Sequence, residues 1–148
     1  MAKSVYVKNL NKVTKGLGVK ANALSEDIKK EVFIRAKVIE NDAVRLKNVS
    51  SINVNTRQED NGFTQVVEAS SFANAPIAAY VNFGTGTFAA QYLAGLPADI
   101  QELARQYYVN GQGRLPANPY LTNPYLRERK KFTENLKKIV KRYSSKSI

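Results

Sequence analysis

The chain has no cysteine, no histidine and no tryptophan, and a single methionine, among its 148 residues. The absence of cysteine excludes disulfides and thiolate chemistry, which suits a reducing compartment. The absence of histidine removes the commonest metal ligand and the commonest general base at neutral pH. The hydrophobic core must therefore be built from leucine, isoleucine, valine, alanine, phenylalanine and tyrosine.

Long apolar runs are also absent. No segment approaches the roughly 20 consecutive apolar residues that span a bilayer, and the N-terminal MAKSVYVKNLNK lacks the apolar stretch of a signal peptide. We therefore expect no association with a membrane. Hydrophobic residues make up 43% of the chain and charged residues 24%, an ordinary balance for a soluble protein. The length of 148 residues predicts a single domain over residues 1–148.

Acidic residues are scarce, because 12 Asp and Glu stand against 23 Lys and Arg, a formal net charge of +11. Such an excess favours a polyanionic partner, which is nucleic acid, an anionic surface or an acidic protein. A soluble protein that is merely basic remains the alternative. The charge begins in a basic N-terminal segment, residues 1–20, which contains five lysines and no acidic residue.

Three segments carry a clear periodicity. Apolar residues recur every three or four positions from Leu24 to Leu46, which predicts one long amphipathic helix. Ser51–Thr56 and Phe63–Ala69 flank an Asn-Gly turn, which predicts an antiparallel hairpin. The helical period returns from residue 125 to residue 143. We expect an α+β fold, with a long N-terminal amphipathic helix and a C-terminal helix packed on a small antiparallel sheet that includes the hairpin.

The stretch AYVNFGTGTFA, residues 79–89, contains GTGTFA, which fits the dinucleotide-binding pattern G-x-G-x-x-G/A. That motif needs a strand before its first glycine, with an acidic residue on a second strand about 20 residues later. Here Asn74-Ala75-Pro76 has the chemistry of a helix start, so Ile77–Phe83 is expected to be helical and to end at Gly84. We therefore expect no cofactor site.

The glycines after this helix predict structure rather than chemistry. Gly84 is expected to leave the helix with a positive φ angle. Gly86 is expected to keep the next segment adaptable, so that residues 84–97 form a mobile loop. Tyr80 and Phe83 are expected to pack beneath the long N-terminal helix.

Candidates for catalysis and metal binding are weak. The acidic residues are scattered, and the adjacent pairs Glu26-Asp27 and Glu59-Asp60 fall at an expected helix start and in the hairpin turn. Metal-dependent hydrolysis needs clustered ligands. We therefore expect neither a metal site nor an enzyme.

The C-terminal helix offers a better candidate, a basic face that suits a polyanion or an acidic partner. Its candidate residues are Arg127, Lys130, Lys131, Lys137, Lys138 and Lys141. The aromatic residues Tyr125, Phe132 and Tyr143 fall instead on the apolar stripe, which indicates a place in the core. A solvated cationic face with no ligand remains equally open.

Two segments carry a resemblance. Residues 77–86 resemble the signature YA-x-YVEFGTG, and residues 118–126 resemble the signature PFLRPA. In these signatures the chain resembles the gene-product-ten-like tail-component family of long-tailed bacteriophages and prophages, whose members are neck or tail-completion proteins. Asn82 stands where the family usually has Glu, and Tyr120 where it usually has Phe. The positions that carry the resemblance are Tyr80, Phe83, Gly84, Thr85, Gly86, Pro119, Tyr120 and Leu121.

The resemblance implies a non-enzymatic virion protein, assembled in the host cytoplasm, that forms a ring (usually a hexamer) between the head connector and the tail. Its neighbours would be connector or stopper proteins and tail-terminator or tail-tube proteins, and its lumen could contact DNA. The expected loop is the candidate contact between subunits, through Thr87, Phe88, Tyr92 and Leu93. The alternative, from net charge alone, is a sequence-independent nucleic-acid-binding protein.

Overall fold

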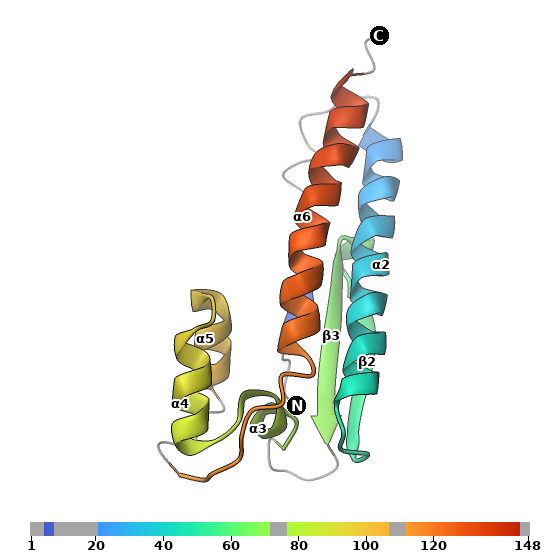
Figure 1. Cartoon of the computed structure of the whole chain (residues 1–148). Coiled ribbons are helices and arrows are strands. Elements are labelled where there is room, and N and C mark those ends of the chain that lie inside the picture. Colours follow the sequence, from blue (N-terminus) through green and yellow to red (C-terminus); the bar gives the residue numbers. More distant parts are fainter. Residues whose placement is uncertain (1–4, 8–20, 72–76, 107–111, 146–148) are drawn as a thin grey trace.

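The computed structural model describes residues 5–7, 21–71, 77–106 and 112–145. Its longest elements are helices α2 (Ala21–Leu46) and α6 (Thr122–Ser145), which lie side by side and run antiparallel (Figure 1). The strands are β1 (Val5–Val7), β2 (Ile52–Glu59) and β3 (Thr64–Ser71), and they form an antiparallel sheet in the order β1-β3-β2. The shorter helices are α3 (Ile77–Phe83), α4 (Gly86–Ala94) and α5 (Ala98–Arg105). The predicted α+β fold is confirmed.

The main core lies between α2, the sheet and α6. The predicted stripe of α2 is fully buried at Leu24, Ile28, Val32, Ala36, Ile39 and Ala43, whereas Leu46 at its end is 37% exposed. Phe132 of α6 is buried against this stripe, and Tyr125 and Tyr143 pack partly buried beside it. Helix α6 begins at Thr122, before the predicted period, because the first turn tolerates Pro124, which has no N–H to satisfy.

The predicted hairpin is also confirmed. Strands β2 and β3 pair from Ile52 with Ser71 to Glu59 with Thr64. The turn between them contains the short 3₁₀ helix η2 (Asp60–Gly62), and all three of its residues have positive φ angles, 51°, 53° and 93°. Aspartate, asparagine and glycine are the residues that adopt this conformation most readily, so the turn sequence fixes the register of the hairpin.

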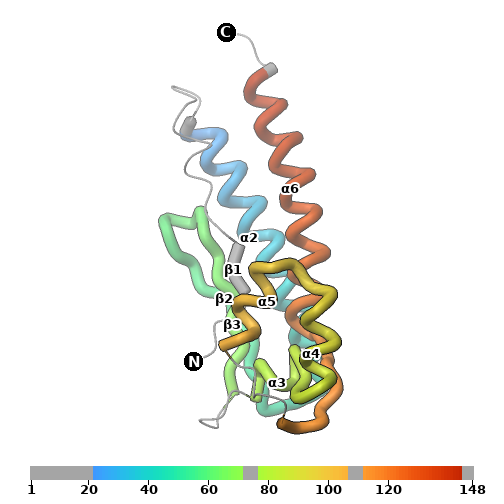
Figure 2. Tube along the Cα trace, turned by 90° about the vertical axis from the view of Figure 1, so that its left-hand side faces the viewer, coloured from blue at the N-terminus to red at the C-terminus, as the bar shows by residue number. Residues whose placement is uncertain are grey.

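The prediction of a mobile loop over residues 84–97 is wrong, because residues 86–94 form helix α4. The helix-forming run AAQYLA outweighs the glycines on either side of it. A turn at Gly95–Pro97 connects α4 to α5, where the Gly95 N–H donates to the carbonyl of Tyr92. We call residues 86–105 the α4–α5 arm. The arm stands beside the first half of α6, on the side away from the sheet (Figures 1 and 2).

Two sequence predictions fall outside the described residues. They are the basic N-terminal segment, except for the three residues of β1, and the helix start at Asn74-Ala75-Pro76. Within the described ranges, no helix combines the length and the apolar character that a membrane crossing requires.

Candidate functional site

The two segments that carry the family resemblance meet in space. The chain returns from the arm to α6 through an extended segment that passes the end of α3. In this segment the Asn118 N–H donates to the Val81 carbonyl at 2.8 Å, and the Tyr120 hydroxyl donates to the Ala78 carbonyl at 2.9 Å. We call residues 78–86 together with 113–122 the α3–α6 junction.

Asn82 is the centre of this junction and is only 1% exposed. Its Oδ1 accepts hydrogen bonds from the N–H groups of Leu121 at 3.0 Å and Thr122 at 3.1 Å. Its Nδ2 donates to the Thr122 Oγ1 at 2.6 Å. The first N–H groups of a helix lack partners within the helix, so Asn82 caps α6 from a position 40 residues earlier in the chain. The amide therefore caps the helix without carrying a charge.

Thr85 holds the crossing of the two backbone segments. Its N–H donates to the Leu115 carbonyl at 2.9 Å, and its Oγ1 accepts from the Leu115 N–H at 2.8 Å. This reciprocal pair closes the base of the arm, and we call it the Thr85–Leu115 clasp.

The glycines on either side of Thr85 make the clasp possible. Gly84 has a φ angle of 79°, so the prediction that it leaves α3 in the left-handed region is confirmed. Gly86 has a φ angle of 58°, and a Cβ atom there would lie 2.1 Å from the Gly113 carbonyl oxygen. The prediction that Gly86 keeps a loop adaptable is therefore wrong, because a crossing backbone locks it in place. That backbone fills the space beside the glycines, and the motif joins helix α3 to helix α4.

Phe83 packs differently from our prediction. It is 4% exposed and belongs to a second, smaller core with Ala79 of α3 and with Ile100 and Ala104 of α5. Tyr80 is half-buried and lines a cavity of about 10 Å³ between α3 and the arm. The side of α3 that faces the main core carries Ala78 and Val81 instead. The helical period places Ala78 and Val81 on one side of α3 and Ala79 and Phe83 on the other. The arm, which we did not predict, covers the side that carries Phe83.

The four residues proposed for subunit contact divide into two pairs. Thr87 and Phe88 project from α4 into solvent, and Phe88 is 41% exposed. Tyr92 and Leu93 are half-buried and pack against the second core. Only the first pair is therefore available to another molecule. Leu115, beside the clasp, is also exposed, at 43%.

The basic residues of α6 divide in a similar way. Arg127 donates to Glu128 at 2.8 Å and also pairs with Asp42 of α2. These two carboxylates raise the pKa of Arg127, and the hydrogen bond from Arg127 holds the pKa of Asp42 below its ordinary value. Lys131 lies 3.6 Å from Glu128. Arg127 therefore links α6 to α2 through Asp42, whereas Lys131 pairs with Glu128 within α6.

Glu128 is the buried charged residue that the sequence analysis missed. It is fully buried between the two long helices, where Arg35 of α2 donates to it at 2.8 Å. The available signal was its position, since Glu128 lies on the apolar stripe between Tyr125 and Phe132. A charged residue at such a position is buried only when it is paired.

The remaining candidates, Lys130, Lys137, Lys138 and Lys141, are exposed. None of them forms an ion pair with any residue in the described part of the chain. We call these four residues the lysine face of α6. They are the part of the predicted basic face whose charge is not used within the described fold.

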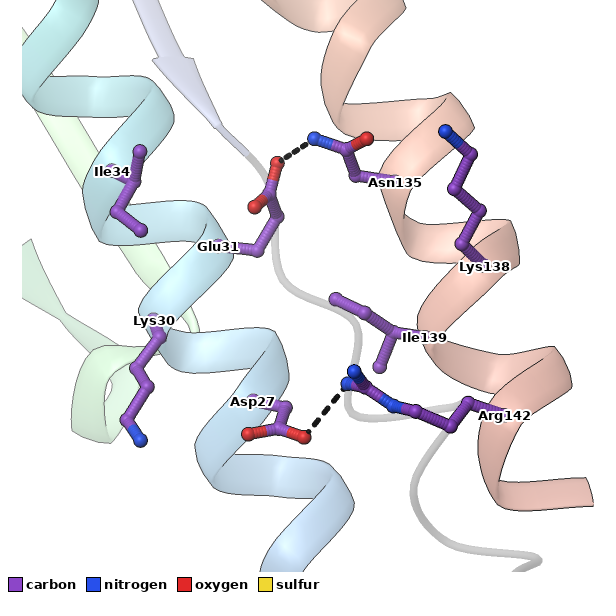
Figure 3. Close-up of a pocket in the computed structure, with 8 residues that line it drawn as sticks. All are labelled: Asp27, Lys30, Glu31, Ile34, Asn135, Lys138, Ile139 and Arg142. Atoms are coloured by element: carbon purple, nitrogen blue, oxygen red, sulfur yellow. Dashed lines mark hydrogen bonds and ion pairs between the residues drawn. The ribbon is translucent and has the colours of Figure 1, made fainter. Parts of the chain in front are cut away.

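A groove of about 310 Å³ separates α2 from the second half of α6 (Figure 3). Asp27 bridges it to Arg142 at 3.0 Å, and Glu31 bridges it to Asn135 at 2.8 Å. Ile139 lies between these two bridges. The bridges fix the long helices to each other. Within the described ranges, no group of three or more metal-ligating side chains is found.

No protein-family model matches this chain, and neither does any curated protein or any solved structure. What the structure defines is an α+β protein with a protruding helical arm, a capped interhelical junction and a helix face of exposed lysines.

Proposed function

We propose that this chain is a structural subunit of a bacteriophage neck, which forms a ring that joins the head connector to the tail or completes the tail. One observation carries the proposal. The two segments that resemble the tail-component signatures, 77–86 and 118–126, form a single structural unit in which Asn82 caps α6 and Tyr120 is hydrogen-bonded to α3. The resemblance thus concerns one connected part of the fold rather than two unrelated short matches.

A closed ring needs two different contact surfaces on each subunit, because each copy meets its neighbours head to tail. The arm offers an exposed apolar side chain in Phe88, at 41% exposure, and Leu115 beside the clasp is also exposed, at 43%. Helix α2 offers another in Phe33 and Val44, both 48% exposed. Phe33 and Val44 are about three helical turns apart, so they lie on one face of α2. The arm and α2 stand on opposite sides of α6 (Figure 1).

This arrangement supports a specific contact, in which the arm surface of one subunit packs against the α2 surface of the next. Repetition of that contact around an axis closes a ring. Its upper and lower faces would then dock a connector or stopper protein and a tail-terminator or tail-tube protein. The chain would act in the virion, as a structural component.

The experiment separates the two surfaces by mutation. Phe88→Asp removes the arm surface, and Val44→Asp removes the α2 surface. In light scattering, each variant alone is expected to remain monomeric while the unmodified chain assembles. An equimolar mixture is expected to form dimers, because one intact arm can still meet one intact α2 surface.

The control is Asn53→Asp, which adds the same charge at an exposed position on β2 and should leave assembly unchanged. Assembly of the Phe88→Asp variant to the same mass as the unmodified chain would contradict the proposed contact. A monomeric unmodified chain at every concentration would contradict the ring itself.

A further inference from the structure

We propose that the lysine face of α6 (Lys130, Lys137, Lys138 and Lys141) binds the phosphate backbone of duplex DNA without reading its sequence. This inference does not depend on the proposed ring, because it concerns one helix of a single chain. The inference rests on three observations: these lysines have no carboxylate partners in the described chain, they are spaced along α6, and no exposed aromatic or large apolar residue accompanies them on that helix.

In the described part of the chain, every arginine except Arg114 has a carboxylate partner, whereas these four lysines have none. Each of the following arginines is paired with a carboxylate: Arg35, Arg45, Arg57, Arg105, Arg127, Arg129 and Arg142. Arginine is the side chain that reads base edges through two parallel hydrogen bonds, whereas lysine acts as a compact point charge. The charges that remain on α6 therefore suit phosphates rather than bases.

The spacing of the lysine face also fits a duplex. Lys130 and Lys141 are separated by about 16 Å along the helix, at about 1.5 Å per residue. That distance corresponds to about five base pairs of duplex, at about 3.4 Å for each pair. Lys30 of α2 is exposed and lines the same groove as Lys138, but the carboxylates of Asp27 and Glu31 stand on the α2 side of that groove, so the lysine face is confined to α6 (Figure 3).

The groups that accompany the lysines distinguish a duplex from a single strand. Proteins that bind single strands stack bases on aromatic side chains. On α6 the aromatic residues Tyr125, Phe132 and Tyr143 pack in or against the main core instead. The lysine face has no aromatic platform, so it favours the uniform charge of a duplex backbone.

An acidic protein is a poorer fit. Protein interfaces are anchored by large apolar or aromatic side chains at their centre. The large hydrophobic residues that are exposed in the described chain lie on α2, on α4 and beside the clasp, and none lies on α6. The lysine face offers charge without an anchor, which is what a phosphate backbone requires.

The test is a titration of the full chain against a labelled DNA duplex of about 20 base pairs, repeated at several salt concentrations. Each phosphate contact lowers log affinity by about 0.9 per log unit of salt concentration, so four contacts predict a slope of about −3.6. This slope corresponds to a loss of affinity of roughly 150-fold between about 50 and about 200 mM salt. The Lys137→Gln/Lys141→Gln variant should reduce the magnitude of this slope by about 1.8. Two duplexes of unrelated sequence should bind with equal affinity.

The matched control is Lys29→Gln/Lys37→Gln, which removes the same charge from lysines of α2 that are paired with Glu26 and Glu40. It should change the slope much less. Glu134→Gln should instead raise the affinity for the duplex, because Glu134 is the exposed acidic residue of α6 and its carboxylate repels phosphate. Circular dichroism serves to check that each variant is folded.

Three results would overturn the proposal. The first is an equal reduction of the salt slope in the lysine-face variant and in its control, which would mean that binding depends on net charge alone. The second is displacement of the duplex by polyglutamate at equal charge concentration, which would point to an acidic protein. The third is the absence of salt-dependent binding by the unmodified chain.

Discussion

Gly86 is the residue on which the Thr85–Leu115 clasp most depends. Gly86→Ala is expected to lower the free energy of unfolding by about 2 kcal/mol or more, because its φ angle of 58° is strained for alanine and its Cβ would meet the Gly113 carbonyl oxygen. Gly95→Ala is the control, since the nearest atom lies 3.9 Å from its Cβ. Urea denaturation measures both variants. Equal stabilities would show that the crossing does not hold the arm.

Tyr120 gives the junction a dependence on pH. Burial raises the pKa of its hydroxyl far above the ordinary value, so the folded chain keeps the proton. The unfolded chain loses that proton near pH 10. The stability that comes from this residue is therefore complete below about pH 10 and falls as the pH rises above it.

Tyr120→Phe tests this linkage. The variant should be less stable than the unmodified chain at pH 7 by about 1 kcal/mol, because it loses the hydrogen bond to the Ala78 carbonyl. Above pH 10 its stability should fall less steeply, so the difference between the two proteins shrinks. Urea denaturation from pH 7 to pH 11 supplies the comparison. A constant difference over this range would argue against the assigned burial.

Among the elements, the pairing of α2 with α6 depends on the buried Glu128. Glu128→Gln is expected to cost about 3 kcal/mol of stability, because it removes the fully buried charge that pairs with both Arg35 and Arg127 and leaves Arg35 with Glu31 alone. Glu134→Gln, on the exposed side of the same helix, should cost much less. Denaturation with urea checks both, and similar costs for the two variants would mean that the buried pairs do not attach α6 to α2.

The elements also show how much the sequence predicts. Helix α2, the hairpin and α6 follow from periodicity, because each buries one continuous stripe or face. Helix α4 was missed because the glycines and the proline around it indicate a loop, while the contacts that stabilise it come from α5 and α3. Within the site, the bend at Gly84 was predictable from its residue type. The cap by Asn82 and the pairing of Thr85 with Leu115 were not, since both depend on segments that are far apart in sequence.

At the scale of the whole molecule, the fold separates three surfaces. The arm carries Phe88, the outer side of α2 carries Phe33 and Val44, and α6 carries the lysine face. Two apolar surfaces on opposite sides support head-to-tail assembly, and the lysine face supports contact with DNA. The two proposals can fail separately, because the apolar variants leave the lysines unchanged.

The central claim is that the chain is a ring subunit, and the most direct measurement is its mass in solution together with negative-stain imaging, over a range of protein concentrations at moderate salt. We predict closed particles with a central hole and a mass that is a single multiple of the chain mass, because a head-to-tail contact that closes has one fixed number of copies. A monomer at every concentration, or an open filament of variable length, would contradict the claim.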